Sequence, residues 1–228
     1  AKNLRASLRN PTWDPTGEYS LPWQSGFAGI AYNEQVTGRA LTSIDDLWDP
    51  AFKGKIGVLS EMRDTLGLIG LSEGVDISKP TAKSLQKAID ALQEQVDSGQ
   101  IKQFTGNDYM DDLTQGNFAA CIGWSGDIAQ LSKDSPELKF VIPESGGTLW
   151  SDTMVIPKGS DGVTAAAEFM DYVYDPVNAA RIAAYVQYVS PVEGVQDELR
   201  KLGGDSAALA DNELLFPTEA SSKNLSSF

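Results

Sequence analysis

The chain has 228 residues, 41 % of them hydrophobic and 22 % charged, which is the composition of a folded globular protein rather than of a disordered one. Its formal net charge of −14 argues against nucleic acid and anionic membrane surfaces as partners; it suits a cationic ligand, or it serves solubility alone. The absence of histidine excludes Ser-His-Asp and Cys-His catalysis and nearly every zinc site, so we expect no metal and no cofactor. No apolar run of about 18 residues occurs, so we expect no membrane insertion.

The first half of the chain alternates predicted strands and helices. Turn signals at Asn10-Pro11 and Asp14-Pro15 make residues 1–20 loop-like. Ser43 and Ser60 are predicted helix caps, Lys79-Pro80-Thr81 is predicted to open a further helix, and short apolar runs between turn signals indicate strands. The predicted elements are a strand at 27–32, a short helix at 43–48, a strand at 56–59, a helix at 61–73, a long amphipathic helix between 81 and 98, and a strand at 101–104.

The second half of the chain continues this alternation. Its predicted elements are a helix at 108–116, a strand at 118–123, a helix at 126–132, strands at 138–142 and 148–156, helices at 161–174 and 176–187, and a helix near 191–202. The single cysteine, Cys121, lies in an apolar run and is predicted to be a buried core thiol. The alternation predicts an α/β fold with largely parallel sheets. Because such folds usually begin with a strand, we expect the front of the protein to be missing from this sequence or supplied separately.

Two short motifs combine an indole ring with a carboxylate. Trp124 and Asp127 lie where a predicted strand ends and a helix begins, and ligand-contacting residues of α/β sheets concentrate at such ends. Trp150 and Asp152 share one face of a predicted strand, because side chains two residues apart point to the same side. A ligand ammonium needs a carboxylate as counter-ion and an aromatic face in place of water, so both motifs are candidate sites. The plain alternative is a core tryptophan with a helix-capping acid at the first motif, and a buried strand with an exposed acid at the second.

Glu61 and Asp64 form a further candidate pair at the start of a predicted helix. Their spacing of three residues would place them on one helical face. Acids in the first turn are also favoured by the helix dipole alone, and Arg63 between them could neutralise either. Other conspicuous side chains are assigned to packing (Trp13, Trp48) or to a solvated helix face (Tyr109, Asp111, Asp112).

Five segments resemble the spermidine/putrescine-binding proteins of bacterial ABC importers, in collinear order over nearly all of the chain. The motifs that carry the resemblance are Tyr19-Ser20-Leu21-Pro22-Trp23, the stretches 46–55 and 116–127, Trp150-Ser151-Asp152 with the residues up to Pro157, and Tyr188-Val189-Ser190-Pro191. Asp46-Leu47-Trp48 followed by Lys53-Gly54 is typical of the wider superfamily. Trp124-Ser125-Gly126-Asp127 together with Trp150-Ser151-Asp152 points more narrowly to the amine-binding branch.

The resemblance implies a periplasmic-binding-protein type II-like α/β fold with two lobes, a hinge and a ligand cleft between the lobes. Residues 1–23 would form the end of lobe 1 and the first hinge crossing, residues 24–147 would form lobe 2, and residues 148–228 would form the second crossing and the return to lobe 1. Roughly the first hundred residues of the family have no counterpart here. The first lobe is therefore expected to be incomplete in this chain.

The resemblance also implies a function that is not enzymatic. The chain is expected to capture a polyamine or similar small amine cation in an acidic, Trp-rich cleft, as a monomer that docks on the permease subunits of an ABC transporter. A periplasmic or extracellular location is implied, with a lipid anchor on the full-length protein as one option. The expected ligand-binding residues are Trp124, Asp127, Trp150, Asp152, Glu61, Asp64, Tyr188, Trp23 and Ser25.

Two other functions stay open. The same scaffold could bind a zwitterion such as γ-aminobutyrate or another amino acid, with Arg63 or a basic residue of the missing lobe holding the ligand carboxylate. Competition between a diamine and an ω-amino acid would separate these two ligands. A carboxylate-based glycosidase is a remote alternative, because nothing in the sequence positions a nucleophile, a metal or a cofactor.

Overall fold

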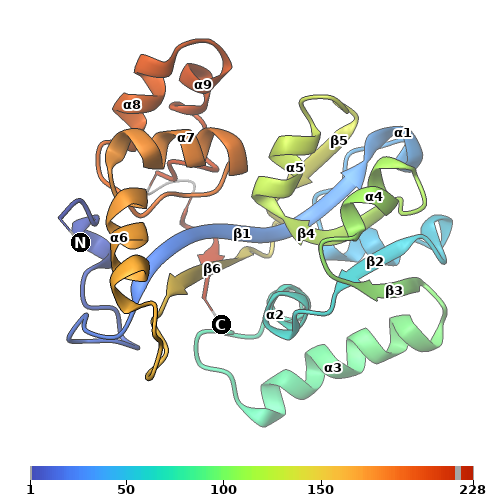
Figure 1. Cartoon of the computed structure of the whole chain (residues 1–228). Helices are drawn as coiled ribbons and strands as arrows, with labels where there is room; N and C mark the ends of the chain where they lie inside the picture. The colour runs from blue at the N-terminus through green and yellow to red at the C-terminus, as the bar shows by residue number, and fades with distance from the viewer. Residues whose placement is uncertain (1, 219–221, 228) are drawn as a thin grey trace. The chain divides into compact units, whose positions relative to one another are not determined.

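The computed structural model describes residues 2–218 and 222–227, and the chain divides into two compact units. Unit 1 comprises Ala1–Gly26 and Ser151–Ala220, and unit 2 comprises Phe27–Trp150 and Ser221–Phe228. The boundaries fall inside two strands, β1 (Leu21–Asn33) and β6 (Gly147–Met154), so each of these strands contributes residues to both units (Figure 1). The predicted assignment of residues to two lobes stays a prediction.

Unit 2 is built around a mixed β-sheet with the strand order β3-β2-β4-β1-β6-β7, in which β5 also pairs with β1. Its further strands are β2 (Ile56–Leu59), β3 (Ile101–Thr105), β4 (Ala120–Trp124), β5 (Leu138–Val141) and β7 (Leu225–Ser226). Helical crossovers follow β2 and β3, so β2 pairs in parallel with both β3 and β4, whereas β1 is antiparallel to β4 and β5. The predicted α/β fold is confirmed, and the prediction of largely parallel pairing is wrong for β1.

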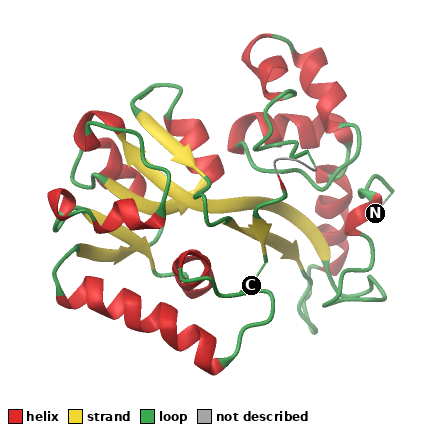
Figure 2. Cartoon of the chain, turned by 180° about the vertical axis from the view of Figure 1, so that it is seen from behind, coloured by secondary structure: helices red, strands yellow, loops and turns green. Residues whose placement is uncertain are grey.

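Several helices of unit 2 begin at a side-chain cap. The helices are α1 (Glu34–Thr37), the 3-10 helices η2 (Ile44–Trp48) and η3 (Pro50–Phe52), α2 (Met62–Ser72), α3 (Ala82–Asp97), α4 (Tyr109–Thr114) and α5 (Ser125–Leu131), of which α4 and α5 have no side-chain cap. Ser43 and Thr81 each form a capping box with the residue three positions on, which fixes the starts of η2 and α3. Helices α2 and α3 pack side by side (Figure 2).

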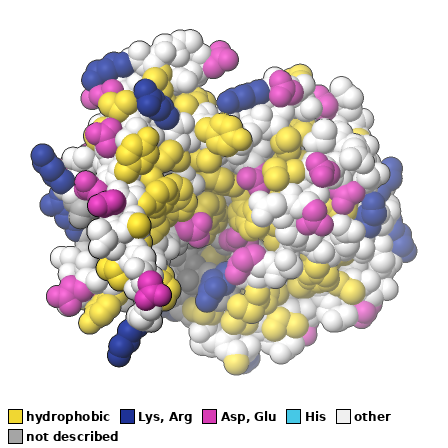
Figure 3. Space-filling view, in the orientation of Figure 1, with side chains coloured by type: hydrophobic (Ala, Val, Ile, Leu, Met, Phe, Trp, Pro, Cys, Tyr) yellow, Lys and Arg dark blue, Asp and Glu magenta, His cyan; other side chains and the backbone are white. Residues whose placement is uncertain are grey.

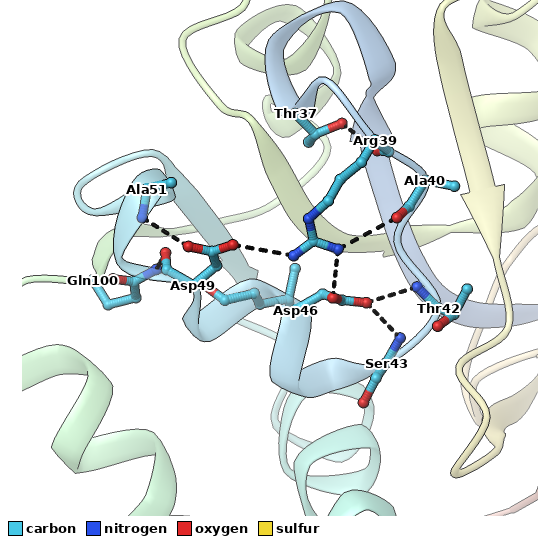
Figure 4. Close-up of polar contacts among 10 residues, drawn as sticks. Thr37, Arg39, Ala40, Thr42, Ser43, Asp46, Asp49, Ala51 and Gln100 are labelled. Carbon is cyan, nitrogen blue, oxygen red and sulfur yellow. Dashed lines mark hydrogen bonds and ion pairs between the residues drawn. The ribbon is translucent and has the colours of Figure 1, made fainter.

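An arginine clamp holds the segment that leads into β2. The guanidinium of Arg39 donates to Asp46 Oδ1 at 2.6 Å and to Asp49 Oδ2 at 3.2 Å (Figure 4). The amide of Gln100 donates to the backbone carbonyl of Asp49 at 2.8 Å, which ties the same segment to the start of β3. These contacts link Arg39, the segment of Asp46 and Asp49, and the residue before β3.

The core of unit 2 is formed by apolar side chains of its central strands and of the helices around them. Phe118, Ile122 and Cys121 are fully buried, and burial raises the pKa of the Cys121 thiol. The predicted role of this cysteine as a core residue is confirmed. Trp48 packs half-buried against the same core, as predicted.

Unit 1 is largely helical in its second part. Its helices are η1 (Ala6–Leu8), α6 (Val163–Val173), α7 (Pro176–Val186), α8 (Val195–Leu202) and α9 (Gly204–Leu209). Its core gathers Leu4, Tyr174, Ala180 and Leu199. Trp13 is 60 % exposed, so its predicted role in packing is wrong.

Helix α6 differs from its neighbour α7 in how little of it is buried. Among the described residues of α6 only Val173 is buried, whereas Val163, Phe169 and Tyr172 are more than half exposed. Figure 3 shows hydrophobic side chains gathered over the part of the surface where Figure 1 draws α6 and α7. Unit 1 therefore presents an apolar helix face to its surroundings.

A glycine in β2 provides a test of the packing of unit 2. A Cβ at Gly57 would lie 2.5 Å from the buried ring of Phe118, so Gly57→Ala should lower the free energy of unfolding by ~1–3 kcal/mol. Gly70→Ala in α2 is the matched control, because its Cβ would meet its neighbours at 3.5 Å or more and alanine favours a helix. In urea unfolding, the midpoint of Gly57→Ala should lie below that of the wild type. The midpoint of Gly70→Ala should lie close to that of the wild type or above it. Equal midpoints for both variants would contradict this packing.

Candidate functional site

Trp124 lies at the junction of β4 and α5 and is held from three directions. Its indole Nε1–H donates to Asp64 Oδ2 at 2.8 Å, and its backbone N–H donates to the hydroxyl of Tyr109 at 3.0 Å. The two aromatic rings meet edge to face, with centroids 6.0 Å apart. Gly123 permits this approach, because a Cβ there would lie 3.0 Å from the Tyr109 ring. The indole ring is therefore oriented before any ligand arrives.

Asp64, in the first turn of α2, is a buried carboxylate that joins two elements of unit 2. The residue is 4 % exposed, and its Oδ1 accepts a hydrogen bond from the hydroxyl of Thr148 on β6 at 2.7 Å. Burial raises the pKa of Asp64, while the hydrogen bonds from Thr148 and Trp124 act in the opposite direction. Because these two donors are neutral, they orient the carboxylate without cancelling its charge.

Glu61 plays a different part from Asp64. It is the N-cap residue of α2, and its Oε2 accepts a hydrogen bond from the backbone N–H of Asp64 at 2.8 Å. Its other oxygen lies 3.7 Å from the guanidinium of Arg63. The prediction that Ser60 caps a helix that begins at Glu61 is wrong, because Glu61 itself is the N-cap residue.

Asp127, in the first turn of α5, is also buried, with 7 % exposure. Its Oδ2 accepts hydrogen bonds from the hydroxyl of Tyr109 at 2.8 Å and from the amide of Asn107 at 3.3 Å. Tyr109, which the sequence analysis did not select as a site residue, therefore connects Asp127 to Trp124, and Asn107 is a second donor to Asp127.

The prediction that Tyr109 lies on a solvated helix face is wrong. Tyr109 is fully buried, together with Leu113 one helical turn later. Burial, reinforced by the charge of Asp127, raises the pKa of the Tyr109 hydroxyl well above its ordinary value. The apolar pair at a spacing of four residues was the available sequence signal, and the acidic neighbours Asp111 and Asp112 obscured it.

Unit 1 holds a second group of the predicted residues. Ser25 on β1 exchanges backbone hydrogen bonds with Val189, at 3.1 and 2.9 Å, so it lies beside the residue that follows Tyr188. The hydroxyls of Ser25 and Ser151 are 2.7 Å apart. Main-chain pairing thus places Ser25 beside Val189, and a contact between hydroxyls links Ser25 to Ser151.

The remaining predicted residues differ in their surroundings. Trp23 packs half-buried, with its ring centroid 6.5 Å from that of Phe169. Asp152 is exposed, and partial burial of its carboxyl raises its pKa. Trp150 belongs to unit 2 and is half-buried, so the predicted pairing of Trp150 with Asp152 on one wall spans the boundary between the units and stays a prediction.

Across 2–218 and 222–227, no three His, Cys, Asp or Glu side chains come together in a way that could hold a metal ion. Within the same ranges, no helix is long and apolar enough to cross a membrane.

Comparisons with known proteins agree with the sequence resemblance. Residues 2–217 match the family described as bacterial extracellular solute-binding protein. The chain is 24 % identical to spermidine/putrescine-binding periplasmic protein 1 of Haemophilus influenzae, covering 94 % of this chain and 59 % of that protein. It is 22 % identical to the spermidine/putrescine-binding periplasmic protein of Escherichia coli, covering 97 % of this chain and 62 % of that protein. The chain thus spans about three fifths of the length of these relatives.

Solved structures show the same fold. A structure described as a putative spermidine/putrescine ABC transporter from Listeria monocytogenes superposes with a TM-score of 0.86 at 27 % identity, covering all of this chain and 68 % of that one. The spermidine/putrescine ABC transporter substrate-binding protein of Streptococcus pneumoniae gives a TM-score of 0.78, also at 27 % identity and with the same two coverages. The predicted resemblance and the predicted fold class are confirmed.

The burial of Asp64 predicts how stability depends on pH. Because its pKa is raised above the ordinary value of 3.8, the folded protein holds this proton more tightly than the unfolded chain does. Wild-type stability, measured relative to Asp64→Asn, should therefore be highest below that value and fall as pH rises through the raised pKa. Asp134→Asn, at an exposed aspartate, is the control for the change in net charge. Urea unfolding from about pH 3 to about pH 7 checks this; a difference between wild type and Asp64→Asn that stays constant with pH would contradict it.

Proposed function

This chain belongs to the family of bacterial extracellular solute-binding proteins, and from that premise we propose that it is the solute-binding component of an ABC-type importer. Its proposed ligand is a polyamine or a similar small amine cation. The proposal draws on relatives whose names describe spermidine and putrescine binding, and on the arrangement around Trp124. Because the chain spans less than two thirds of the length of these relatives, the activity is proposed for the protein to which the chain belongs.

The observation that carries the proposal is the contact between the Trp124 indole and the buried Asp64 carboxylate. The hydrogen bond lies at the edge of the ring, so it leaves the ring face for stacking against a cation. Thr148 and Trp124 are neutral donors, so an ammonium group could serve as the counter-ion of Asp64 when the acid is ionised. An oriented indole and a fixed carboxylate are the two features that recognition of an amine requires.

The proposal assigns ligand contacts to residues of both units. In unit 2 these are Trp124, Asp127, Asp64, Glu61 and Trp150; in unit 1 they are Asp152, Tyr188, Trp23 and Ser25. Glu61 has the weakest case among them, because capping of α2 already accounts for its position. Asp152 has a stronger case, because its exposed carboxyl is accessible to a ligand and its raised pKa reflects partial desolvation.

The proposed partners and location follow from the same family. We propose that the protein acts outside the cytoplasmic membrane, in the periplasm or extracellularly, and delivers its ligand to the permease subunits of the transporter. The proposed function involves no chemical conversion of the ligand. Closure of a two-lobed protein around its ligand is the proposed signal to the permease.

Calorimetry tests the proposed ligand class. Titration of the protein with putrescine and with spermidine should give saturable binding that γ-aminobutyrate, carrying one amine and one carboxylate, does not compete away. Absence of a heat and of a thermal shift with every cationic amine would refute the amine proposal. Binding of γ-aminobutyrate in preference to the diamines would replace it by the zwitterion alternative.

Asp152 offers a single-residue test of the same proposal. Replacing it with alanine leaves a ligand ammonium without its counter-ion, which should weaken amine binding by ~2 kcal/mol, about thirtyfold in Kd; this is the lower end of the range for such pairs because Asp152 is exposed. Asp161→Ala, at another exposed aspartate of unit 1, removes the same charge and should leave Kd unchanged. Equal affinities of the two variants would remove Asp152 from the site.

A further inference from the structure

The hydroxyl of Tyr109 is the point at which Trp124 and Asp127 are joined. It donates to Asp127 Oδ2 at 2.8 Å and accepts from the backbone N–H of Trp124 at 3.0 Å. A phenol has a single proton to donate and lone pairs to accept with, so one atom fixes both the carboxylate and the main chain of the tryptophan. Tyr109 itself is fully buried, which keeps it away from any ligand.

A second donor reinforces the contact to Asp127. The amide of Asn107, two residues before Tyr109, reaches the same oxygen, Asp127 Oδ2, at 3.3 Å. Both donors come from the turn after β3 and the first residue of α4. The segment 107–109 thus holds one end of the Asp127 carboxylate in a single orientation.

The ring and the hydroxyl of Tyr109 have separable roles. The ring lies edge to face against Trp124 and fills the space beside Gly123, where a Cβ would approach it to 3.0 Å. The hydroxyl adds the two polar contacts. Phenylalanine at this position would keep the packing and would remove the acceptor of the part-buried backbone N–H of Trp124.

We propose that Tyr109 is a positioning residue of the amine site, acting through Trp124 and Asp127 without touching the ligand. This inference rests on the proposed function and deepens it. In this proposal, the Tyr109 hydroxyl fixes the position of the Trp124 indole relative to the Asp127 carboxylate. Nothing in the sequence pattern assigns such a role to an aromatic residue at the start of an acidic helix.

Tyr109→Phe tests the proposal by calorimetry. The variant should bind putrescine or spermidine about tenfold more weakly than wild type. Tyr32→Phe is the matched control, because Tyr32 is also a buried tyrosine of unit 2 and burial raises the pKa of its hydroxyl as well. Tyr32 pairs with Ala120, four residues or about 13 Å along β4 from Trp124, so the control should lose stability without losing affinity. Unchanged affinity in Tyr109→Phe, or an equal loss in the control, would overturn the proposal.

A double-mutant cycle separates positioning from general destabilisation. If Tyr109 acts through Asp127, Tyr109→Phe should weaken binding much less in an Asp127→Asn background than in wild type. Additive losses would show that the hydroxyl acts elsewhere. Should Tyr109→Phe fail to fold, Asn107→Ala replaces it, because Asn107 is exposed and donates to the same carboxylate oxygen.

A spectroscopic measurement without ligand distinguishes failure of this inference from failure of the proposed function. The indole N–H resonance of Trp124, assigned by Trp124→Phe, should shift in Tyr109→Phe and stay in place in Tyr32→Phe. If wild type binds no amine and the resonance shifts, the amine function fails while the positioning of Trp124 by Tyr109 stands. If wild type binds amines and neither the resonance nor the affinity responds, the positioning role is wrong and the amine function stands.

Discussion

The arrangement of unit 2 depends on how one buried carboxylate is accommodated. Asp64 is almost inaccessible to solvent, and a charged group in such a position is costly unless it is hydrogen-bonded. It meets this requirement with two neutral donors from distant parts of the chain, Thr148 on β6 and Trp124 at the end of β4. The same contacts that make the burial tolerable therefore fix the orientation of the indole ring.

A second buried carboxylate is handled in the same way. Asp127 is oriented by Tyr109 and Asn107, whose hydroxyl and amide are also neutral. These two hydrogen bonds fix the orientation of the carboxylate. Two oriented acids flanking one tryptophan give this end of the sheet a negative character that suits a cation, in line with the overall charge of the chain.

Helix caps, turn residues and apolar runs allow much of the fold to be predicted from the sequence. They allow less of the candidate site to be predicted. Strand β2 and helix α3 are predicted to within about a residue, because Pro80-Thr81 and Gly99 mark the helix ends in the sequence. The direction of β1 and the contact between Asp64 and Trp124 are not readable, since both depend on pairing between segments far apart in the chain. The burial of Tyr109 is missed for a related reason. Its acidic neighbours in the sequence suggest a solvent-exposed helix, and the burial of the tyrosine becomes apparent only in the folded structure.

In the proposed site, ionisation of Asp64 and binding of a cation are thermodynamically coupled. Burial favours the protonated acid, so without a ligand the folded protein bears an unfavourable free energy when this group is ionised. A cation placed against the Trp124 face would stabilise the ionised form and offset that cost. By linkage, the same interaction that lowers the pKa of Asp64 strengthens ligand binding by an equal free energy. A carboxylate that is hydrogen-bonded but not neutralised is therefore suited to bind a cation more strongly than an acid already paired with arginine would.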